Sequence, residues 1–504
     1  MSDDDSPTEQ TDDSSTTDAA EAAVDGGAVA TEAPQSRFWG VVPSGWNLVD
    51  GSEVYDVNPS YTPKEEEVTY IEMDALDTEL PFPKYSKKRR AADYSGKLFR
   101  EGDTLFARIT PCTENGKAAF VDEMETDVGI GSTEYAVLSP DCDRIHPLYL
   151  YCLAKSYPVR NYAVSRMRGS TGRQRVPFDV FRRELNMVLP PYEVQSKIAS
   201  ILYNTDLAIE NSNEVISKTK RIGKGFTQKI FKKGSKEPLS SNCSSWDERK
   251  EEVLEERKQK WWDAEKERCE RAGKNADKSK YNEPLDLLSQ RLPDLPEGWT
   301  WVSLDTLVAY DIGYRGKTPL YSDAGVPVIS SGNIQNGELD LEDTKYVSEE
   351  TYEEWLTRGV PKEGDFIVTT EAPVGKVAIF PEGDYLPTRR IITLRTVGVD
   401  NRYLKSAFDH PRVQNYLKAQ SGGSTVSRIL KDYLLRTPIL LPPAEEESQI
   451  VDALSTLDRQ IKKEQEMRTK FKALKNGLMQ DLLTGDVQIN DEEIEIVEKV
   501  REYV

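Results

Sequence analysis

Short, mostly apolar runs bounded by turn residues recur along much of the chain, a pattern typical of strands separated by turns. Six such runs are Thr104–Ile109, Lys117–Val121 and Tyr135–Leu138 in the first half, and Phe366–Thr369, Val377–Phe380 and Ile391–Leu394 in the second. Stretches with helical periodicity intervene, for example at 147–155 and 402–408. These patterns predict that each half of the chain contains a mixed α+β domain of about 150 residues.

Two longer stretches repeat their apolar positions every three or four residues, which predicts long helices. Their apolar seams are formed by Ile198, Leu202 and Ile209 in the first stretch and by Ile450, Leu454, Leu457 and Ile461 in the second. A seam this narrow is typical of helix pairing. We expect the two helices to pack antiparallel, as a bar of about 60 Å between two globular domains. The alternative is two unrelated helices, each lying on its own domain.

The chain repeats itself. Three motifs recur in the same order: Pro43-Ser-Gly-Trp46 as Pro296-Glu-Gly-Trp299, Gly169-Ser-Thr171 as Gly423-Ser-Thr425, and Leu189-Pro-Pro191 as Leu441-Pro-Pro443. The offsets between such matches change slowly along the chain. A colinear series of this kind predicts two copies of one module with insertions in their loops.

Together these patterns predict two similar α/β-mixed domains separated by two antiparallel coiled-coil helices, related by a pseudo-two-fold internal repeat. The expected segments are an acidic tail at 1–36, a first globular domain at 37–191, a spacer helix at 192–234, a charged helical insertion at 235–292, a second globular domain at 293–443, a second spacer helix at 444–485 and a C-terminal tail at 486–504. Trp246, Trp261 and Trp262 could anchor the insertion to its own chain or dock it on a partner.

Composition limits the class of protein. The chain of 504 residues has 66 Lys and Arg against 87 Asp and Glu, a formal charge of −21. Residues 1–36 contain no Lys or Arg and should be disordered. No apolar run is long enough to span a membrane. The five scattered Cys and two His predict no disulfide framework and no metal site, and a cytoplasmic setting fits best.

A search for catalytic motifs returns weak matches. Leu189-Pro-Pro-Tyr192 is similar to the Asp/Asn-Pro-Pro-Tyr motif of amino-methyltransferases, but Leu189 cannot accept a hydrogen bond from a target amine. Ala372–Lys376 lacks the spacing of a phosphate-binding loop. We find no Ser/His/Asp set. No catalytic residue is therefore assigned.

Clusters of basic residues are more informative, because local runs of Arg with Gly, Ser and Thr can contact phosphates. The candidate DNA contacts are Lys87, Lys88, Arg89, Arg90, Arg166, Arg168, Arg173 and Arg175 in the first copy, and Tyr314, Arg315, Lys317, Arg389, Arg390, Ser424, Thr425 and Arg428 in the second. For any single cluster, a solvated surface is the alternative. The placement beside Gly-Ser-Thr in both copies favours a function.

The doubled motifs resemble those of the specificity subunit of type I restriction–modification enzymes. The resemblance covers roughly residues 37–487. It rests on Arg108-Ile-Thr-Pro111, on Gly313-Tyr-Arg-Gly-Lys-Thr-Pro319, on both Leu-Pro-Pro helices and on Leu478-Met-Gln-Asp-Leu-Leu-Thr-Gly485.

This resemblance implies a non-catalytic subunit with two target recognition domains, each reading half of a split, asymmetric duplex DNA sequence. The paired helices would fix the gap between the half-sites and hold two methyltransferase subunits, which restriction subunits would join. No cofactor is expected in this chain. S-adenosylmethionine, ATP and Mg would belong to the partners.

The acidity is unusual for a DNA-binding protein, and we expect a salt-loving source in which salt screens repulsion from phosphates. Two other functions remain open. A stand-alone DNA methyltransferase with degenerate motifs predicts that the purified chain binds S-adenosylmethionine. A coiled-coil protein adaptor predicts that Arg→Glu changes at Arg173 and Arg175 leave DNA affinity untouched.

Overall fold

The computed structural model describes residues 35–36, 39–93, 95–170, 172–233, 245–288, 295–314, 318–335, 337–342, 344–423, 427–487, 489 and 494–503. The chain divides into two compact units. Unit 1 comprises Met1–Asp206 and Leu474–Val504, and unit 2 comprises Leu207–Ala473. The acidic tail predicted at 1–36 lies outside the described residues, except for Gln35 and Ser36 of strand β1.

Unit 1 is built around two four-stranded sheets. The larger sheet is antiparallel and has the order β4 (Tyr55–Val57), β11 (Tyr135–Pro140), β8 (Thr104–Ala107) and β9 (Ala118–Phe120). The smaller has the order β6 (Lys87–Arg90), β5 (Glu67–Ile71), β10 (Gly129–Gly131) and β7 (Lys97–Phe99), with β5 and β10 parallel. A ribbon pairs β3 (Asn47–Asp50) with β12 (Asn186–Leu189). Helices α1 (Pro147–Lys155) and α2 (Tyr157–Ser165) complete the unit.

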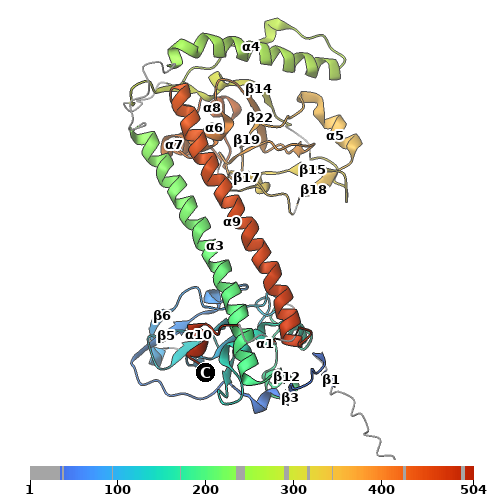
Figure 1. Ribbon diagram of the computed structural model, residues 1–504. Coiled ribbons are helices and arrows are strands. Elements are labelled where there is room, and N and C mark those ends of the chain that lie inside the picture. Colours follow the sequence, from blue (N-terminus) through green and yellow to red (C-terminus); the bar gives the residue numbers. More distant parts are fainter. Residues whose placement is uncertain are drawn as a thin grey trace, which may run out of the picture. The chain divides into compact units, whose positions relative to one another are not determined.

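The larger sheet of unit 2, several of whose strands are labelled in Figure 1, repeats the strand order of the larger sheet of unit 1. Its larger sheet has the order β14 (Val308–Ile312), β22 (Ile391–Thr396), β19 (Phe366–Thr369) and β20 (Val377–Ile379). Its smaller sheet has the order β18 (Lys345–Val347), β15 (Val326–Ile329) and β21 (Leu386–Pro387), with β15 and β21 parallel. A ribbon pairs β13 (Thr300–Ser303) with β23 (Pro438–Leu441). The helices are α5 (Glu349–Trp355), α6 (Asn401–Phe408), α7 (Pro411–Gln420) and α8 (Lys431–Leu435).

The equivalence extends to single hydrogen bonds inside the cores. In unit 1 the hydroxyl of Tyr149 donates to the carbonyl oxygen of Val188 at 3.1 Å. In unit 2 the hydroxyl of Tyr403 donates to the carbonyl oxygen of Leu440 at 2.7 Å. Each bond ties a core helix of the unit, α1 or α6, to its ribbon, because a buried hydroxyl must find a partner. The colinear motifs thus mark two copies of one strand order.

Two long helices, α3 (Tyr192–Lys233) and α9 (Ala444–Thr484), run antiparallel within each unit. In unit 1 Lys475 of α9 pairs with Asp206 of α3. In unit 2 Arg468 donates to Asn213 at 2.9 Å, and a Cβ on Gly223 would lie 3.5 Å from Leu457. As residue numbers rise on α3 they fall on α9, which defines the antiparallel register.

The ends of these helices also belong to the hydrophobic cores of the two units. Ile198 and Leu202 belong to the hydrophobic core of unit 1, and Ile450, with Leu454 against it, belongs to that of unit 2. Helix α3 therefore begins on unit 1 and helix α9 begins on unit 2. A helix that lies on its own domain is the alternative to helix pairing in the sequence-based interpretation. Ile209 is buried, whereas Leu457 and Ile461 are half-buried.

The C-terminal segment predicted as a tail packs within unit 1. Helix α10 (Glu498–Arg501) places Val500 in the core, where the backbone oxygen of Val500 lies 3.0 Å from Nε2 of His146. The hydroxyl of Tyr192 donates to the oxygen of Tyr503 at 3.0 Å, and Lys499 pairs with Asp122 at 2.8 Å. This segment contributes apolar contacts and ion pairs to unit 1.

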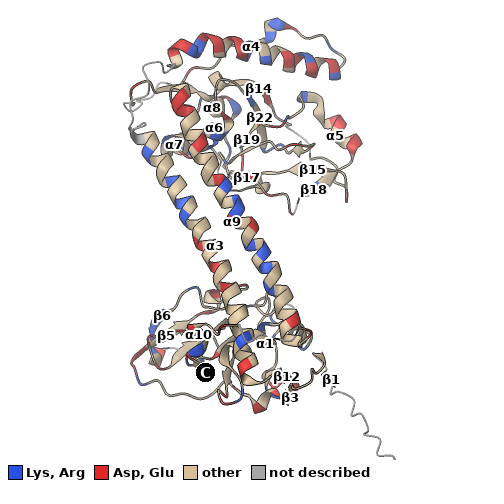
Figure 2. Ribbon diagram, viewed as in Figure 1, with Lys and Arg blue, Asp and Glu red and all other residues tan. Residues whose placement is uncertain are grey.

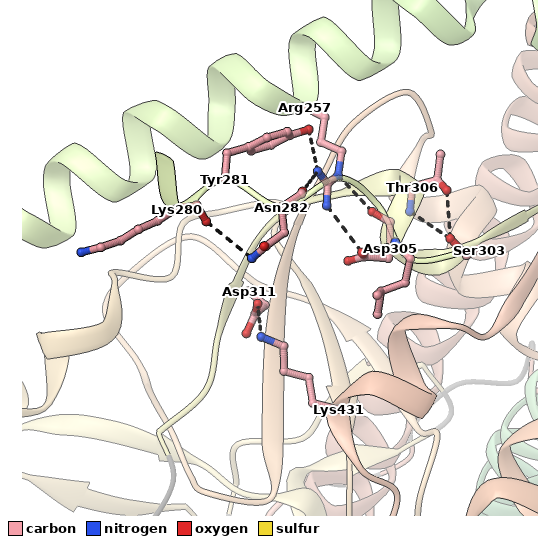
Figure 3. Close-up of polar contacts among 10 residues, drawn as sticks. Arg257, Lys280, Tyr281, Asn282, Ser303, Asp305, Thr306, Asp311 and Lys431 are labelled. Carbon is pink, nitrogen blue, oxygen red and sulfur yellow. Dashed lines mark hydrogen bonds and ion pairs between the residues drawn. The ribbon is translucent and has the colours of Figure 1, made fainter. Parts of the chain in front are cut away.

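The charged insertion forms α4 (Trp246–Arg271), which packs on unit 2 beside the edge strand β14. Figure 2 shows Asp and Glu next to Lys and Arg along this helix. Its inner side is fixed by Arg257, whose guanidinium donates to the oxygen of Asp305 at 3.1 Å and to the hydroxyl of Tyr281 at 2.6 Å (Figure 3). Trp246 lies in the core of unit 2 and Trp261 packs partly against a second apolar cluster, so both anchor the helix to its own chain.

Candidate nucleic-acid interface

A short loop in unit 1 carries several of the predicted contacts. This first hairpin, residues 168–175, is closed by Arg168 and Arg175, which exchange two backbone hydrogen bonds of 2.9 Å. Its second arm extends the sheet beyond β8, because the N–H of Val176 donates to the oxygen of Arg108 at 2.8 Å. Gly169 has a φ of +129°, and a Cβ there would lie 2.9 Å from the oxygen of Arg173. Only glycine fits this position without strain.

Unit 2 has an equivalent loop at the same place in the strand order. This second hairpin, residues 422–428, is closed by Gly422 and Arg428, again through two backbone hydrogen bonds of 2.9 Å. The N–H of Ile429 donates to the oxygen of Thr370 at 3.0 Å, just beyond β19, and Gly423 has a φ of +125°. The predicted contacts Ser424 and Thr425 lie outside the described residues.

The two closing arginines are held by carboxylates. The Arg175 guanidinium reaches Glu134 through Nε at 2.9 Å and Nη2 at 2.8 Å, and Nη1 of Arg108 lies 3.4 Å from the same carboxylate. In unit 2 Glu371 pairs with Arg428 at 3.1 Å and with Arg390 at 3.8 Å. A bidentate arginine–carboxylate pair fixes orientation as well as charge. Arg175 and Arg428 therefore anchor their hairpins.

The exposed part of the first hairpin carries different side chains. The backbone N–H of Arg173 donates to the oxygen of Ser170 at 2.9 Å and closes a turn in which Gly172 has a φ of +80°. The side chains of Arg168 and Arg173 are exposed. No ion pair is described for either of them in the parts of the chain given above. Their guanidinium groups are thus available to an external anion.

Strand β6 presents four consecutive basic residues on the edge of the smaller sheet. Lys87, Lys88, Arg89 and Arg90 are all exposed. Lys87 pairs with Glu72, Lys88 pairs with Glu125, and Arg90 pairs with Glu66 at 3.2 Å. Exposed ion pairs of this kind contribute about 0–1 kcal/mol each, so a phosphate can replace the carboxylate at small cost.

The remaining predicted contacts have different surroundings. Arg166 pairs with Glu184 at 2.8 Å, and hydrogen bonds from Tyr162 and Arg166 hold the pKa of the Glu184 carboxyl below its usual range. Arg389 is exposed. Arg315 and Lys317 lie outside the described residues.

Tyr314 corrects one sequence-based expectation. Its side chain is only 3% exposed and belongs to an apolar cluster of unit 2, where its hydroxyl donates to the oxygen of Gly359 at 2.5 Å. A tyrosine in this position fills the core and cannot contact DNA from the surface.

The structure also assembles a basic cluster that sequence reasoning missed. Arg108, Lys97 and Arg182 all lie over the ring of Phe178, at 4.0, 4.7 and 5.9 Å from its centroid. Burial and the neighbouring cations Arg108 and Arg182 lower the pKa of Lys97. Lys97, Arg108 and the segment 178–182 come from separate places in the sequence, and no motif or run of charge connects them.

Two searches of the structure gave no site of another kind. In the described ranges, no group of three or more His, Cys, Asp or Glu side chains is placed to hold a metal ion. Among the same residues, no helix is both long enough and apolar enough to cross a membrane.

Comparison with known proteins defines the class. Residues 296–470 match the family model of the type I restriction modification DNA specificity domain, so the second half of this chain contains a domain of that class. The chain is 24% identical to the type I restriction enzyme EcoAI specificity subunit of Escherichia coli, over 66% of this chain and 62% of that protein. It is also 24% identical to the EcoEI specificity subunit of Escherichia coli, over 82% of this chain and 77% of that one.

Among solved structures, a chain from a type I restriction–modification system aligns with 88% of this chain and 99% of its own length, at 18% identity and a TM-score of 0.48. The chain as a whole is therefore similar to type I restriction enzyme specificity subunits, and residues 296–470 match the family model of their DNA specificity domain.

Proposed function

We propose that each unit reads one half of a split, asymmetric duplex DNA target. The observation that carries this proposal is the pair of equivalent hairpins. In each unit, the residue after the hairpin donates its N–H to the residue that directly follows the equivalent strand. These bonds run from Val176 to Arg108 after β8 and from Ile429 to Thr370 after β19. Their sequences differ, with Arg173-Gln174 in one and Val426-Ser427 in the other. The same backbone arrangement with two different sets of side chains suits the recognition of two different half-sites.

The exposed cations supply the attraction to DNA. Arg168 and Arg173 of the first hairpin, the four basic residues of β6, and Arg389 in unit 2 contact the phosphate backbone in this proposal, which positions each unit without reading sequence. In the first hairpin Gln174, whose amide can both donate and accept, reads base edges. Arg175 and Arg428 act through the hairpins that they hold.

In this proposal the helices α3 and α9 set the gap between the half-sites, and the two units are the copies of a pseudo-two-fold internal repeat. With 42 and 41 residues, each helix is about 60 Å long. In this proposal the helices dock two methyltransferase subunits, and restriction subunits join through them. S-adenosylmethionine, ATP and Mg bind to those partners, and this chain performs no catalysis in the cytoplasmic complex.

The formal charge of −21 remains to be accounted for. We infer a salt-loving source, because high salt screens the repulsion between an acidic protein and phosphates. In a titration of the assembled complex with KCl, specific DNA binding should persist at molar salt. Loss of specific binding well below that concentration would argue against such a source.

The function can be tested by mapping methylated bases in a host that expresses this chain with its methyltransferase subunit. We expect a split, asymmetric motif. Replacing residues 37–190 by those of a relative should change one half of the motif, and replacing residues 293–443 should change the other half. A continuous motif, or a motif that neither replacement alters, would contradict the proposal.

A further inference from the structure

The cluster around Phe178 is a concentration of positive charge in an acidic protein. Three cations share one aromatic ring, and Arg175 lies close by because Glu134 pairs with both Arg108 and Arg175. In the described ranges Glu134 is the one carboxylate that forms an ion pair with any of these four cations. The cluster therefore has a net positive charge.

Packing like charges together has a cost that cation–π contacts offset only in part. Each such contact attracts a cation to the ring but does not remove the repulsion between the cations. The repulsion is expressed in the lowered pKa of Lys97, to which burial contributes first and the cations of Arg108 and Arg182 next. An anion placed among these groups would remove the repulsion.

The geometry leaves two of the cations available to such an anion. The guanidinium of Arg108 is committed through Nε to the oxygen of Val176 at 2.7 Å and through Nη1 to Glu134 at 3.4 Å. Arg182 is exposed and Lys97 is half-buried. Among the described residues of unit 1, no hydrogen bond is made by the side chain of either.

We propose that Lys97 and Arg182, with Arg108 behind them, form a binding site for a backbone phosphate of duplex DNA at the base of the first hairpin. This proposal rests on the proposed function of the chain. The site is next to the hairpin because Arg108 bonds to Val176 through both its backbone oxygen and its side chain. A phosphate bound here would fix how deeply the first hairpin enters a groove of the duplex.

The site belongs to unit 1 alone. The position equivalent to Arg108 is Thr370, which accepts the corresponding backbone hydrogen bond from Ile429. The position equivalent to Phe178 is Lys431, which pairs with Asp311 at 2.5 Å (Figure 3). In the described part of unit 2, the smaller sheet has three strands and no strand corresponding to β7, which carries Lys97. The two units would therefore hold the DNA backbone differently.

The test uses the full chain assembled with its methyltransferase subunits and a fluorescent duplex, titrated over a range of KCl. Arg182→Gln and Lys97→Gln should each weaken binding to target and unrelated duplexes by the same factor. Each should also reduce the slope of log affinity against log salt by about 0.9, the value for one lost phosphate contact. The methylated motif should stay the same.

The neighbouring residue Arg183 provides a matched control. Arg183 is exposed on the same helical turn, Val180–Glu184, and has no described contact with Phe178. Arg183→Gln removes the same charge and should leave the slope unchanged, while Arg182→Lys should restore it. The site is disproved if Arg182→Gln and Lys97→Gln both keep the wild-type slope while the wild-type complex binds DNA. Failure of the wild-type complex to bind DNA would instead disprove the proposed function.

Discussion

At the scale of single residues, one arginine position recurs in both units with a carboxylate from a different source. Glu134 directly precedes β11, whereas Glu371 follows β19, yet each pairs with the arginine that closes a hairpin. The arginine is thus supported in both copies although the supporting residue has moved. Which side chain anchors a hairpin and which is free depends on these carboxylates.

Glu134→Gln should destabilise unit 1 and loosen its hairpin. The neutral amide removes the charge that compensates Arg108 and Arg175, and hydrogen bonds to charged groups contribute about 1.5–3 kcal/mol. Because the Arg175 side chain is 42% exposed, we expect a loss of about 1–2 kcal/mol. Urea unfolding measures this loss, and Glu101→Gln, at an exposed site of the same unit, is the control. Equal unfolding midpoints for the two variants would show that Glu134 does not support the hairpin.

Lys155 makes the stability of unit 1 depend on pH. Burial, followed by the neighbouring cation of Lys475, lowers the pKa of Lys155 to about 7. The unfolded chain therefore binds more protons than the folded chain between pH 7 and about 10, so stability rises with pH across this window and is flat below it.

Lys155→Met should remove this dependence. Between pH 7 and pH 9.5, we expect the free energy of unfolding of the wild-type protein to rise by about 2 kcal/mol relative to that of the variant. This rise is smaller than the full shift of the Lys155 pKa implies, because part of the side chain reaches the surface. The difference between the two thermal unfolding midpoints, followed over that range, gives the result. A difference that stays constant with pH would contradict the assignment.

At the scale of elements, the inserted helix α4 is part of unit 2 because of a buried arginine. Arg257 is 5% exposed and lies 3.6 Å from the carboxylate of Asp305, which also accepts the N–H of Leu285 at 2.8 Å. It further donates to the oxygen of Asn282 at 3.0 Å (Figure 3). One side chain thus joins the helix, the segment after it and the start of the second copy.

Arg257→Met should release α4 from unit 2. Removing one partner of a buried ion pair leaves an uncompensated charge and costs about 3–5 kcal/mol. Hydrogen exchange in 246–271 and protease cleavage in 272–288 should both increase. Lys250→Met, at an exposed position of the same helix, should change neither measurement. Equal protection in the two variants would show that α4 is held by its apolar contacts alone.

At the scale of the whole molecule, the chain has two units with similar larger sheets and two long helices. Each helix contributes residues to both units by its position in the sequence, and each pairs antiparallel within a unit. If the helices set the gap between half-sites, their length should be convertible into base pairs.

Adding seven residues to α3 after Asn213 and seven to α9 after Met467 keeps the facing positions paired. The added length is about 10 Å, or about three base pairs of duplex. The methylated motif should keep both half-sites and gain about three unspecified positions between them. Lengthening α3 alone should break the pairing and abolish methylation. A motif whose gap stays the same in the doubly lengthened chain would contradict the role of the helices.

The sequence by itself predicted three strands of the larger sheet in each copy and the two long helices, and its colinear motifs predicted the repeat. It succeeded because a short apolar run bounded by turn residues marks a buried strand, and 3.6-residue spacing marks the buried side of a helix, and both patterns are local in sequence. The basic runs at 87–90 and 166–175 were also visible, since charge density is local in sequence.

Tertiary structure alone decided the contacts between distant positions. It buried Tyr314, placed Ile198 and Ile450 in globular cores, brought the C-terminal helix into unit 1 and gathered Lys97, Arg108 and Arg182 around Phe178. These outcomes depend on which surfaces meet when strands and helices pack, and that choice minimises exposed apolar area over the whole unit. No local pattern encodes it.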